Sequence, residues 1–133
     1  MTDELREIPL FAGVSDAGLD RIALSAGRIE AEPGQVLALP GDAGSGMFVI
    51  LEGEVAVELR SANVELGPGN FFGELALLVP EQSRVARVRA KTRVRCISLS
   101  RDDFLALLDS EPGLALPMLR ELARRLVSVS AGS

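Results

Sequence analysis

EPGQVLALPGDAGSGMFVILEGEVAVEL, residues 32–59, consists of short β-like runs separated by turn-forming residues. The runs QVLAL, MFVILE and EVAVEL are rich in the aliphatic and β-branched residues that favour strands. Turn-forming residues precede and separate these runs, namely Pro33-Gly34, Gly41-Asp42 and Gly53. RIEAE before this stretch and NVEL after it continue the same pattern. Many short strands at such close turn spacing predict a β barrel or a β roll.

Helices are predicted on both sides of the strand-rich region. Residues 15–26 place apolar side chains at helical spacing after the candidate N-cap Ser15. Ser100 and Asp103 form a capping box, which begins a second helix that reaches about Leu108. The predicted order is therefore a helix, a β roll, and further helices.

A final helix is expected from around Leu114 to Val129. Because proline lacks an N–H and clashes with the preceding turn, this helix must begin near Pro117 or kink there. Its apolar side chains recur at 3-4-3 spacing in Leu119, Leu122, Leu126 and Val129. Such a narrow stripe can cover the roll, cover a ligand, or pair with a second copy in a homodimer. We expect Leu119 and Leu122 to pack in the core.

The composition excludes several classes of function. The 133 residues contain no histidine and one cysteine, so catalytic triads with histidine, the usual zinc sites and internal disulfides are excluded. A net charge of -5 argues against direct binding of nucleic acid or anionic membranes, which requires a basic surface. The acidic first ten residues do not resemble a signal peptide, and no apolar run is long enough for a membrane span. We expect a cytoplasmic protein that is not an enzyme and holds no cofactor or metal.

Basic and apolar residues alternate in the run from 84 to 96. The basic positions are Arg87, Arg89, Lys91, Arg93 and Arg95. The apolar or small positions are Ala86, Val88, Ala90, Val94 and Cys96. This period is typical of half-buried strands, with the basic row on the outer face. We interpret the row as a solvated face balanced by nearby acids, because the chain has no Trp or Tyr to stack on bases.

Two charged residues interrupt the apolar pattern. Arg84 has the parity of the apolar face, and an inward guanidinium needs a carboxylate, carbonyl groups or a bound anion. Glu74 lies within the apolar run FFGELALLVP, directly after Gly73. Either the two charges pair with each other, or a ligand places a hydroxyl on Glu74 and a phosphate on Arg84. A ligand with a sugar hydroxyl and a phosphate would be a nucleotide.

FFGELALLVPEQSRVARVRA, residues 71–90, resembles the phosphate-binding cassette of cyclic nucleotide-binding domains, as in catabolite activator proteins and protein kinase A regulatory subunits. Residues 32–59 resemble the β-roll segment of the same family. The resemblance implies a mainly β fold, a flattened jelly-roll-like double-stranded β-helix with an N-terminal helical segment and two C-terminal helices. The expected single domain covers 1–133, with a helical lead at 1–27, the roll at 28–99, the cassette at 71–86 and C-terminal helices at 100–130.

The resemblance also implies a ligand site. Glu74 would bind the ribose 2′-hydroxyl, and Arg84 would bind the cyclic phosphate. Backbone N–H groups would bind phosphate oxygens, namely those of Gly73, Glu74, Leu75, Ala76, Val85 and Ala86. The apolar side chains against the base and sugar would be Val57, Val64 and Leu66, for which plain core packing is the alternative.

Two residues depart from the family pattern. Val85 stands where the family has Ser, Thr or Ala, so a hydroxyl for phosphate or guanine is absent and cGMP is disfavoured. Val129 stands where a Thr would contact the base, although Arg125 and Ser130 could serve there. We expect a sensor for a cyclic nucleotide, cAMP rather than cGMP, that acts on an output domain or partner protein. The alternative is a degenerate domain without ligand, acting in protein interaction or as a structural module.

Overall fold

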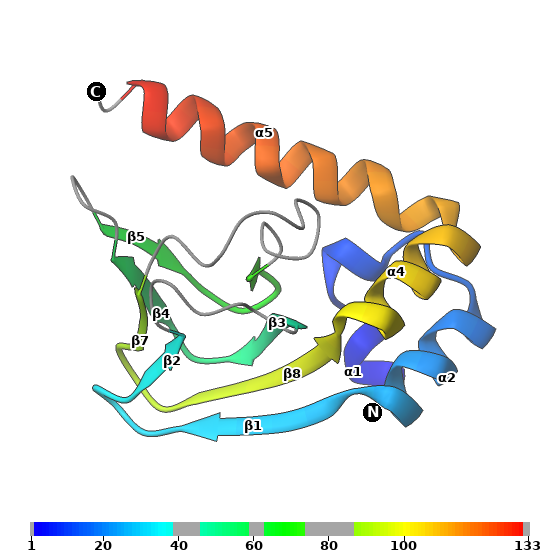
Figure 1. Ribbon diagram of the computed structural model, residues 1–133, viewed down its shortest axis with the longest axis horizontal. Helices are drawn as coiled ribbons and strands as arrows, with labels where there is room; N and C mark the ends of the chain where they lie inside the picture. Colours follow the sequence, from blue (N-terminus) through cyan, green and yellow to red (C-terminus); the bar gives the residue numbers. More distant parts are fainter. Residues whose placement is uncertain (1, 39–45, 59–62, 74–86, 132–133) are drawn as a thin grey trace. The chain divides into compact units, whose positions relative to one another are not determined.

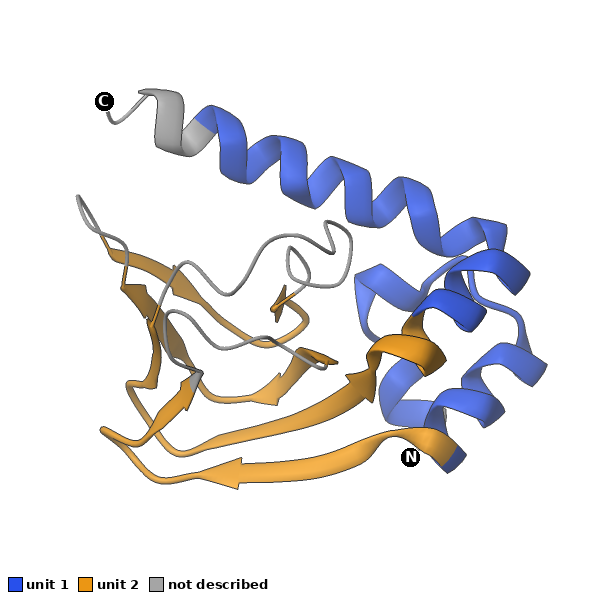
Figure 2. Cartoon of the chain, in the orientation of Figure 1, with its two compact units in different colours: residues 1–24, 105–133 blue, residues 25–104 orange. Residues whose placement is uncertain are grey.

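The alternation of apolar residues and turns produces two sheets in the computed structural model. The structure describes residues 2–38, 46–58, 63–73 and 87–131. Residues 25–104 form a strand-rich unit, and residues 1–24 and 105–133 form a helical unit (Figure 2). Each unit has its own architecture, and the boundary after Phe104 falls inside a helix.

The strand-rich unit consists of two four-stranded antiparallel sheets (Figure 1). The first sheet has the order β1-β8-β3-β6, and the second has the order β2-β7-β4-β5. The strands are β1 (Gly27–Ala31), β2 (Val36–Ala38), β3 (Gly46–Glu52), β4 (Val55–Glu58), β5 (Asn63–Leu66), β6 (Phe71–Phe72), β7 (Arg87–Ala90) and β8 (Val94–Ser100). The predicted β roll is confirmed, and every strand except β6 overlaps a β-like or alternating run that the sequence indicated.

Neighbouring stretches of chain pass from one sheet to the other side by side. β3 pairs with β8 in the first sheet, and their continuations β4 and β7 pair in the second. The two stretches bend at the same level, at Gly53 and at residues 91–93. Glu54 joins the two bends, since its N–H donates to Thr92 Oγ1 at 3.1 Å and its carbonyl accepts from the Lys91 N–H at 2.9 Å.

Gly53 makes this bend possible. Its φ is 86°, in the left-handed region that glycine adopts without steric cost. A Cβ at this position would lie 2.1 Å from the carbonyl oxygen of Arg93, far inside van der Waals contact. Another residue at Gly53 would therefore force the two bends apart.

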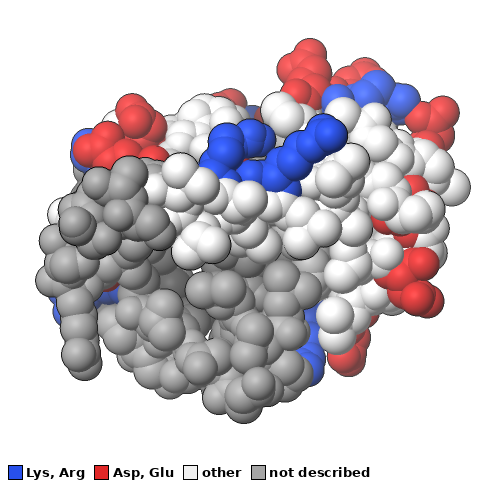
Figure 3. All heavy atoms as spheres, turned by 90° about the horizontal axis from the view of Figure 1, so that it is seen from above, with Lys and Arg blue, Asp and Glu red and all other residues white. Residues whose placement is uncertain are grey.

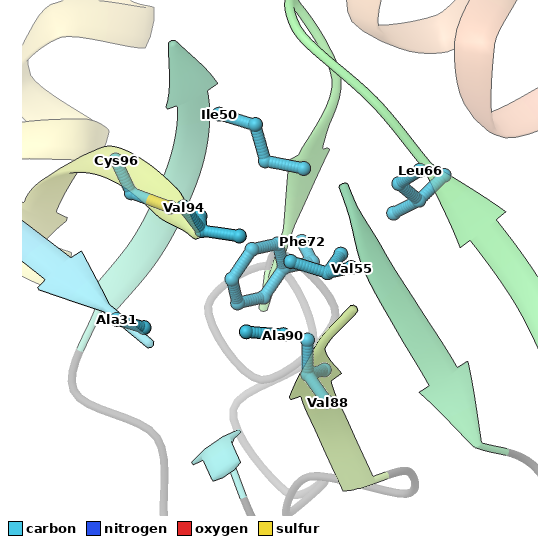
Figure 4. Packing of buried hydrophobic residues seen from close by; sticks show 9 residues of the cluster. All are labelled: Ala31, Ile50, Val55, Leu66, Phe72, Val88, Ala90, Val94 and Cys96. Atoms are coloured by element: carbon cyan, nitrogen blue, oxygen red, sulfur yellow. The ribbon is translucent and has the colours of Figure 1, made fainter. Parts of the chain in front are cut away.

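The core of the roll lies between the inner faces of the two sheets. Nine buried side chains meet there (Figure 4): Ala31, Ile50, Val55, Leu66, Phe72, Val88, Ala90, Val94 and Cys96. We call this set the roll core. Burial raises the pKa of the Cys96 thiol to about 11, so this thiol stays protonated near neutral pH and packs as a small apolar side chain.

The basic row lies on the outer side of the roll, as predicted. Val88, Ala90, Val94 and Cys96 are buried, whereas the alternate basic residues are exposed or half-buried. Each basic residue has a glutamate nearby: Arg87 and Arg89 approach Glu58 at 3.8 and 3.7 Å, Lys91 pairs with Glu65, Arg93 approaches Glu30 at 3.7 Å and Glu32 at 4.0 Å, and Arg95 contacts Glu52 at 2.8 Å. Such exposed pairs add little stability, but they neutralise the row. The interpretation as a solvated, charge-balanced face is confirmed.

The helical unit is built from both ends of the chain. Its elements are α1 (Thr2–Arg6), the 3-10 turn η1 (Pro9–Phe11), α2 (Asp16–Ser25), most of α4 (Arg101–Ser110), the 3-10 turn η2 (Pro112–Leu114) and α5 (Ala115–Ala131). Ser15 Oγ caps α2 by accepting from the Gly18 N–H at 3.1 Å, and Ser100 Oγ accepts from the Asp103 N–H at 3.2 Å at the start of α4. Both predicted caps are confirmed. None of the described helices is long and apolar enough to cross a membrane.

The start of the last helix is predicted correctly, but one of its core positions is not. Pro117 lies in the first turn of α5, so the helix begins near this proline. Leu119 was expected in the core and is instead 61% exposed, while its neighbour Met118 is buried. Successive residues on a helix are turned by about 100°, so the burial of Met118 directs Leu119 outward. Leu122 is half-buried.

A single buried acid joins the two ends of the chain within the helical unit. Glu111 accepts hydrogen bonds from the Ser15 N–H at 2.7 Å, from the Ser15 hydroxyl at 2.9 Å and from Arg21 at 3.4 Å. Gly13 and Gly113 bring their backbones together nearby, since a Cβ on Gly113 would lie 2.2 Å from the Gly13 carbonyl oxygen. The hydrogen bonds from the Ser15 backbone and hydroxyl, together with Arg21, lower the pKa of Glu111.

The unfolding free energy should therefore depend on the charge of Glu111. A carboxylate with a lowered folded-state pKa stabilises the fold fully above its ordinary pKa of about 4.3, and loses that effect as the pH falls through the folded value. We expect Glu111→Gln to be less stable than the wild type at pH 7 in urea titrations. The difference between the two proteins should shrink as the pH is lowered below about 4. A difference that stays constant down to pH 2 would contradict this role.

Candidate functional site

β6 leads the chain to the first of the predicted ligand residues. This strand lies at the edge of the first sheet and pairs with β3, Phe72 opposite Phe48 and Phe71 opposite Val49. Gly73 follows with a φ of 90°, a conformation that favours glycine. The backbone thus turns at the first of the predicted ligand residues of the cassette.

The other predicted cassette residues lie outside the described part of the chain. They are Glu74, Leu75, Ala76, Arg84, Val85 and Ala86. Their roles remain predictions from the sequence.

The three predicted apolar ligand contacts lie together on the inner face of the second sheet. Val57 of β4 faces Val64 of β5, and Val57 also faces Val88 of β7. Val57 and Val64 are half-buried and pack against the roll core, whereas Leu66 is buried as a member of that core. The two valines therefore keep apolar surface that a ligand could contact, and Leu66 mainly contributes packing.

Arg125 and Val129 belong to α5, in the helical unit. The Nε–H of Arg125 donates to Glu121 Oε2 at 3.0 Å, one helical turn earlier. Arg124 also approaches Glu121, at 3.7 Å. The Glu121 carboxylate thus holds the guanidinium of Arg125 against the helix. Val129 and Ser130 lie in the last turns of α5, where the structure describes only the backbone.

One neighbour of the site was not found from the sequence. The rings of Phe48 and Phe72 are stacked, with centroids 5.0 Å apart and planes 20° from parallel. Each phenylalanine fits an ordinary apolar strand position, so nothing in the local pattern indicates that the two rings meet. Only the pairing of β3 with β6 brings them together.

Comparison with protein families gives the assignment. The family model described as cyclic nucleotide-binding domain matches residues 28–111 of the sequence, a range that begins in β1 and extends past α4. This chain belongs to the cyclic nucleotide-binding domain family. The match confirms the resemblance seen in the sequence, and the roll of two antiparallel sheets is the fold which that resemblance implied.

Known members of different kinds are similar to this cyclic nucleotide-binding domain. A cyclic nucleotide-gated potassium channel from Rhizobium etli is 40% identical over 108 residues, which are 81% of this chain and 30% of the channel. The regulatory subunit of a cAMP-independent protein kinase A from Trypanosoma brucei superposes with a TM-score of 0.79 and 29% identity, covering 92% of this chain and 44% of that one. The catabolite activator protein of Thermus thermophilus superposes with a TM-score of 0.75 and 29% identity, covering 93% of this chain and 61% of that one. The chain therefore spans less than two thirds of each of these proteins.

Replacing Gly73 should strain the chain where β6 ends. We expect Gly73→Ala to lose about 1 to 3 kcal/mol of unfolding free energy, because alanine disfavours a φ of 90°. Gly67→Ala is the matched control, since that glycine lacks a left-handed φ and a Cβ there meets no atom within 4 Å. Urea denaturation of both variants measures the difference. Equal losses in both would show that the backbone at Gly73 is not constrained.

Proposed function

We propose that this domain is a sensor that binds cAMP and passes its occupancy to a partner protein or an output domain. The observation that carries the proposal is the family match over residues 28–111. Gly73-Glu74 and Arg84 at cassette spacing within that range support it. Under this proposal the domain binds the nucleotide and performs no reaction on it.

Each proposed contact follows from the chemistry of the ligand. Glu74 is proposed to accept from the ribose 2′-hydroxyl, and Arg84 to donate to the cyclic phosphate, since a guanidinium fork matches two phosphate oxygens. Backbone N–H groups from Gly73 to Ala76 and at Val85 and Ala86 complete the phosphate shell.

The half-buried pair of Val57 and Val64 is proposed to contact the apolar faces of the sugar and base. Arg125 and Val129 of α5 are proposed as further contacts to the base. Arg125 donates its Nε–H to Glu121, which fixes where its guanidinium lies along α5.

Preference for cAMP over cGMP rests on Val85. A valine has no hydroxyl to hydrogen-bond guanine or a phosphate oxygen, so this position offers cGMP no added contact. The alternative is a degenerate domain without ligand. It is supported by the similarity to the regulatory subunit of a cAMP-independent protein kinase A, which has a similar roll. In that alternative Glu74 and Arg84 pair with each other, and the domain acts through protein contacts alone.

Titration calorimetry with cAMP and cGMP tests the proposal. We expect wild-type protein to bind cAMP more tightly than cGMP. Arg84→Leu should weaken cAMP binding by at least about thirtyfold, because losing one partner of a desolvated charge pair costs roughly 2 kcal/mol or more. The melting temperature of the ligand-free protein should change little, because an arginine whose partner is the ligand does not stabilise the ligand-free fold.

Arg87→Leu is the control for this experiment. Arg87 lies three positions further on in the same run, is exposed, and has Glu58 at 3.8 Å. Its replacement should leave cAMP affinity within about twofold of wild type, as expected for an exposed ion pair. Absence of heat with either nucleotide, combined with a large loss of stability in Arg84→Leu, would favour the degenerate alternative.

A second copy of the chain is proposed as the partner of α5. Among the side chains of α5 that the structure describes, four large apolar ones are exposed: Leu116 by 53%, Leu119 by 61%, Leu126 by 68% and Val127 by 66%. At about 100° per residue they form one stripe, and Leu119 and Leu126 are a heptad apart, which suits pairing with an identical helix. In Figure 3, one group of basic side chains near the middle of the view lies among uncharged surface, and a second group at the upper right lies among acidic side chains.

Light scattering after gel filtration tests the dimer. Wild-type protein should elute as a dimer at micromolar concentration. Leu119→Glu should elute as a monomer, because the free energy of burying a carboxylate between the two α5 helices exceeds the stabilisation from their apolar contact. Leu24→Glu is the control, since Leu24 of α2 is 88% exposed and lies outside the stripe. A monomeric wild type, or equal effects of the two variants, would contradict the proposal.

A further inference from the structure

We infer that Phe48 is a positioning residue for the ligand site: its ring holds Phe72 and thereby fixes the backbone of Gly73, the first of the proposed phosphate contacts. This inference rests on the nucleotide binding proposed above. It assigns a role to a side chain of β3, a strand that contributes none of the proposed ligand contacts. The argument depends on how β6 is held.

β6 needs its side chains to stay in place. The strand has only two residues and lies at the edge of the first sheet, where β3 is its one neighbour among the described strands. Successive residues of a strand point to opposite faces, so Phe71 and Phe72 bury their rings on opposite sides of the sheet. Because so short a strand forms few backbone hydrogen bonds, these two rings provide most of the buried apolar surface that anchors it.

The upstream end of β6 is held by backbone hydrogen bonds. The Ile50 N–H donates to the Asn70 carbonyl at 2.8 Å, and the Gly69 N–H donates to the Ile50 carbonyl at 2.8 Å. Because the strands are antiparallel, Ile50 marks the start of β6, and Phe48 stands opposite its last residue, Phe72. Phe48 is therefore placed to control the downstream end, next to Gly73.

The contact between the rings restrains Phe72 from the edge of the core. Phe72 belongs to the roll core, whereas Phe48 is half-buried and packs against that core from outside. The stacked rings, 5.0 Å apart, leave Phe72 little freedom to tilt. Gly73 has no side chain to anchor its own backbone, so its orientation follows from that of Phe72. Removing the ring of Phe48 should loosen Gly73 more than it weakens the fold.

Three variants separate positioning from simple core packing. Phe48→Leu removes the ring, Phe48→Tyr keeps it, and Phe11→Leu makes the same change at a buried site of the helical unit. The first measurement is cAMP affinity by calorimetry. The second is amide hydrogen exchange at Phe72 and Gly73 in the ligand-free protein, which needs no nucleotide.

Phe48→Leu should weaken cAMP binding by about two- to tenfold, the range expected from losing one aromatic pair. It should also speed amide exchange at Phe72 and Gly73 while the amides of β1 and β8 keep their protection. Phe48→Tyr should retain wild-type affinity and exchange. Phe11→Leu should lower the melting temperature and leave both measurements at wild-type values.

The inference is overturned if Phe48→Leu lowers the melting temperature but leaves cAMP affinity and the exchange of Gly73 unchanged. It is overturned as well if Phe11→Leu changes both measurements as much as Phe48→Leu does. If wild-type protein binds no cyclic nucleotide, the proposed function fails. The exchange data then still decide whether Phe48 fixes the backbone of Gly73.

Discussion

The close approach of Gly53 to the carbonyl of Arg93 is the constraint on which the roll depends. Two neighbouring antiparallel stretches of chain pass between the two sheets at this point, and they can do so together only because no side chain separates them. Since both stretches bend at one level, the inner faces of the sheets face each other and enclose the roll core. In the first sheet β6 pairs with β3, and the chain turns at Gly73 directly after it.

Most strands could be predicted from the sequence, because the alternation of apolar and polar residues within a strand indicates which face is buried. The run from Arg87 to Cys96 alternates except at Thr92, which is exposed in the bend between β7 and β8. The structure buries the apolar set of side chains and pairs the basic set with glutamates. The run NVEL was expected as a strand and is β5, and Ser15 was expected as a cap and is one. In these cases neighbouring residues contain all the information that the local structure needs.

Contacts between distant residues could not be predicted in this way. Glu111 follows a helix as an ordinary polar residue, and only the folded chain brings it to Ser15, 96 positions away. Leu119 shows a related difficulty: helical spacing tells which residues share a face, but not which face is covered, and Met118 takes the buried place. For the site, the glycine turn and the cassette motif were visible in the sequence. The stacking of Phe48 on Phe72 was not, because it depends on strand pairing.

The strand order also decides when the roll can form during synthesis. β7 and β8 are the last strands in the sequence, yet each lies inside its sheet, between β2 and β4 or between β1 and β3. Until they leave the ribosome, the earlier strands expose unpaired edges and half of a core. The first strands alone therefore add little folding free energy to the nascent chain. Folding waits for residues 87–100, and a polypeptide that stops before them would tend to aggregate.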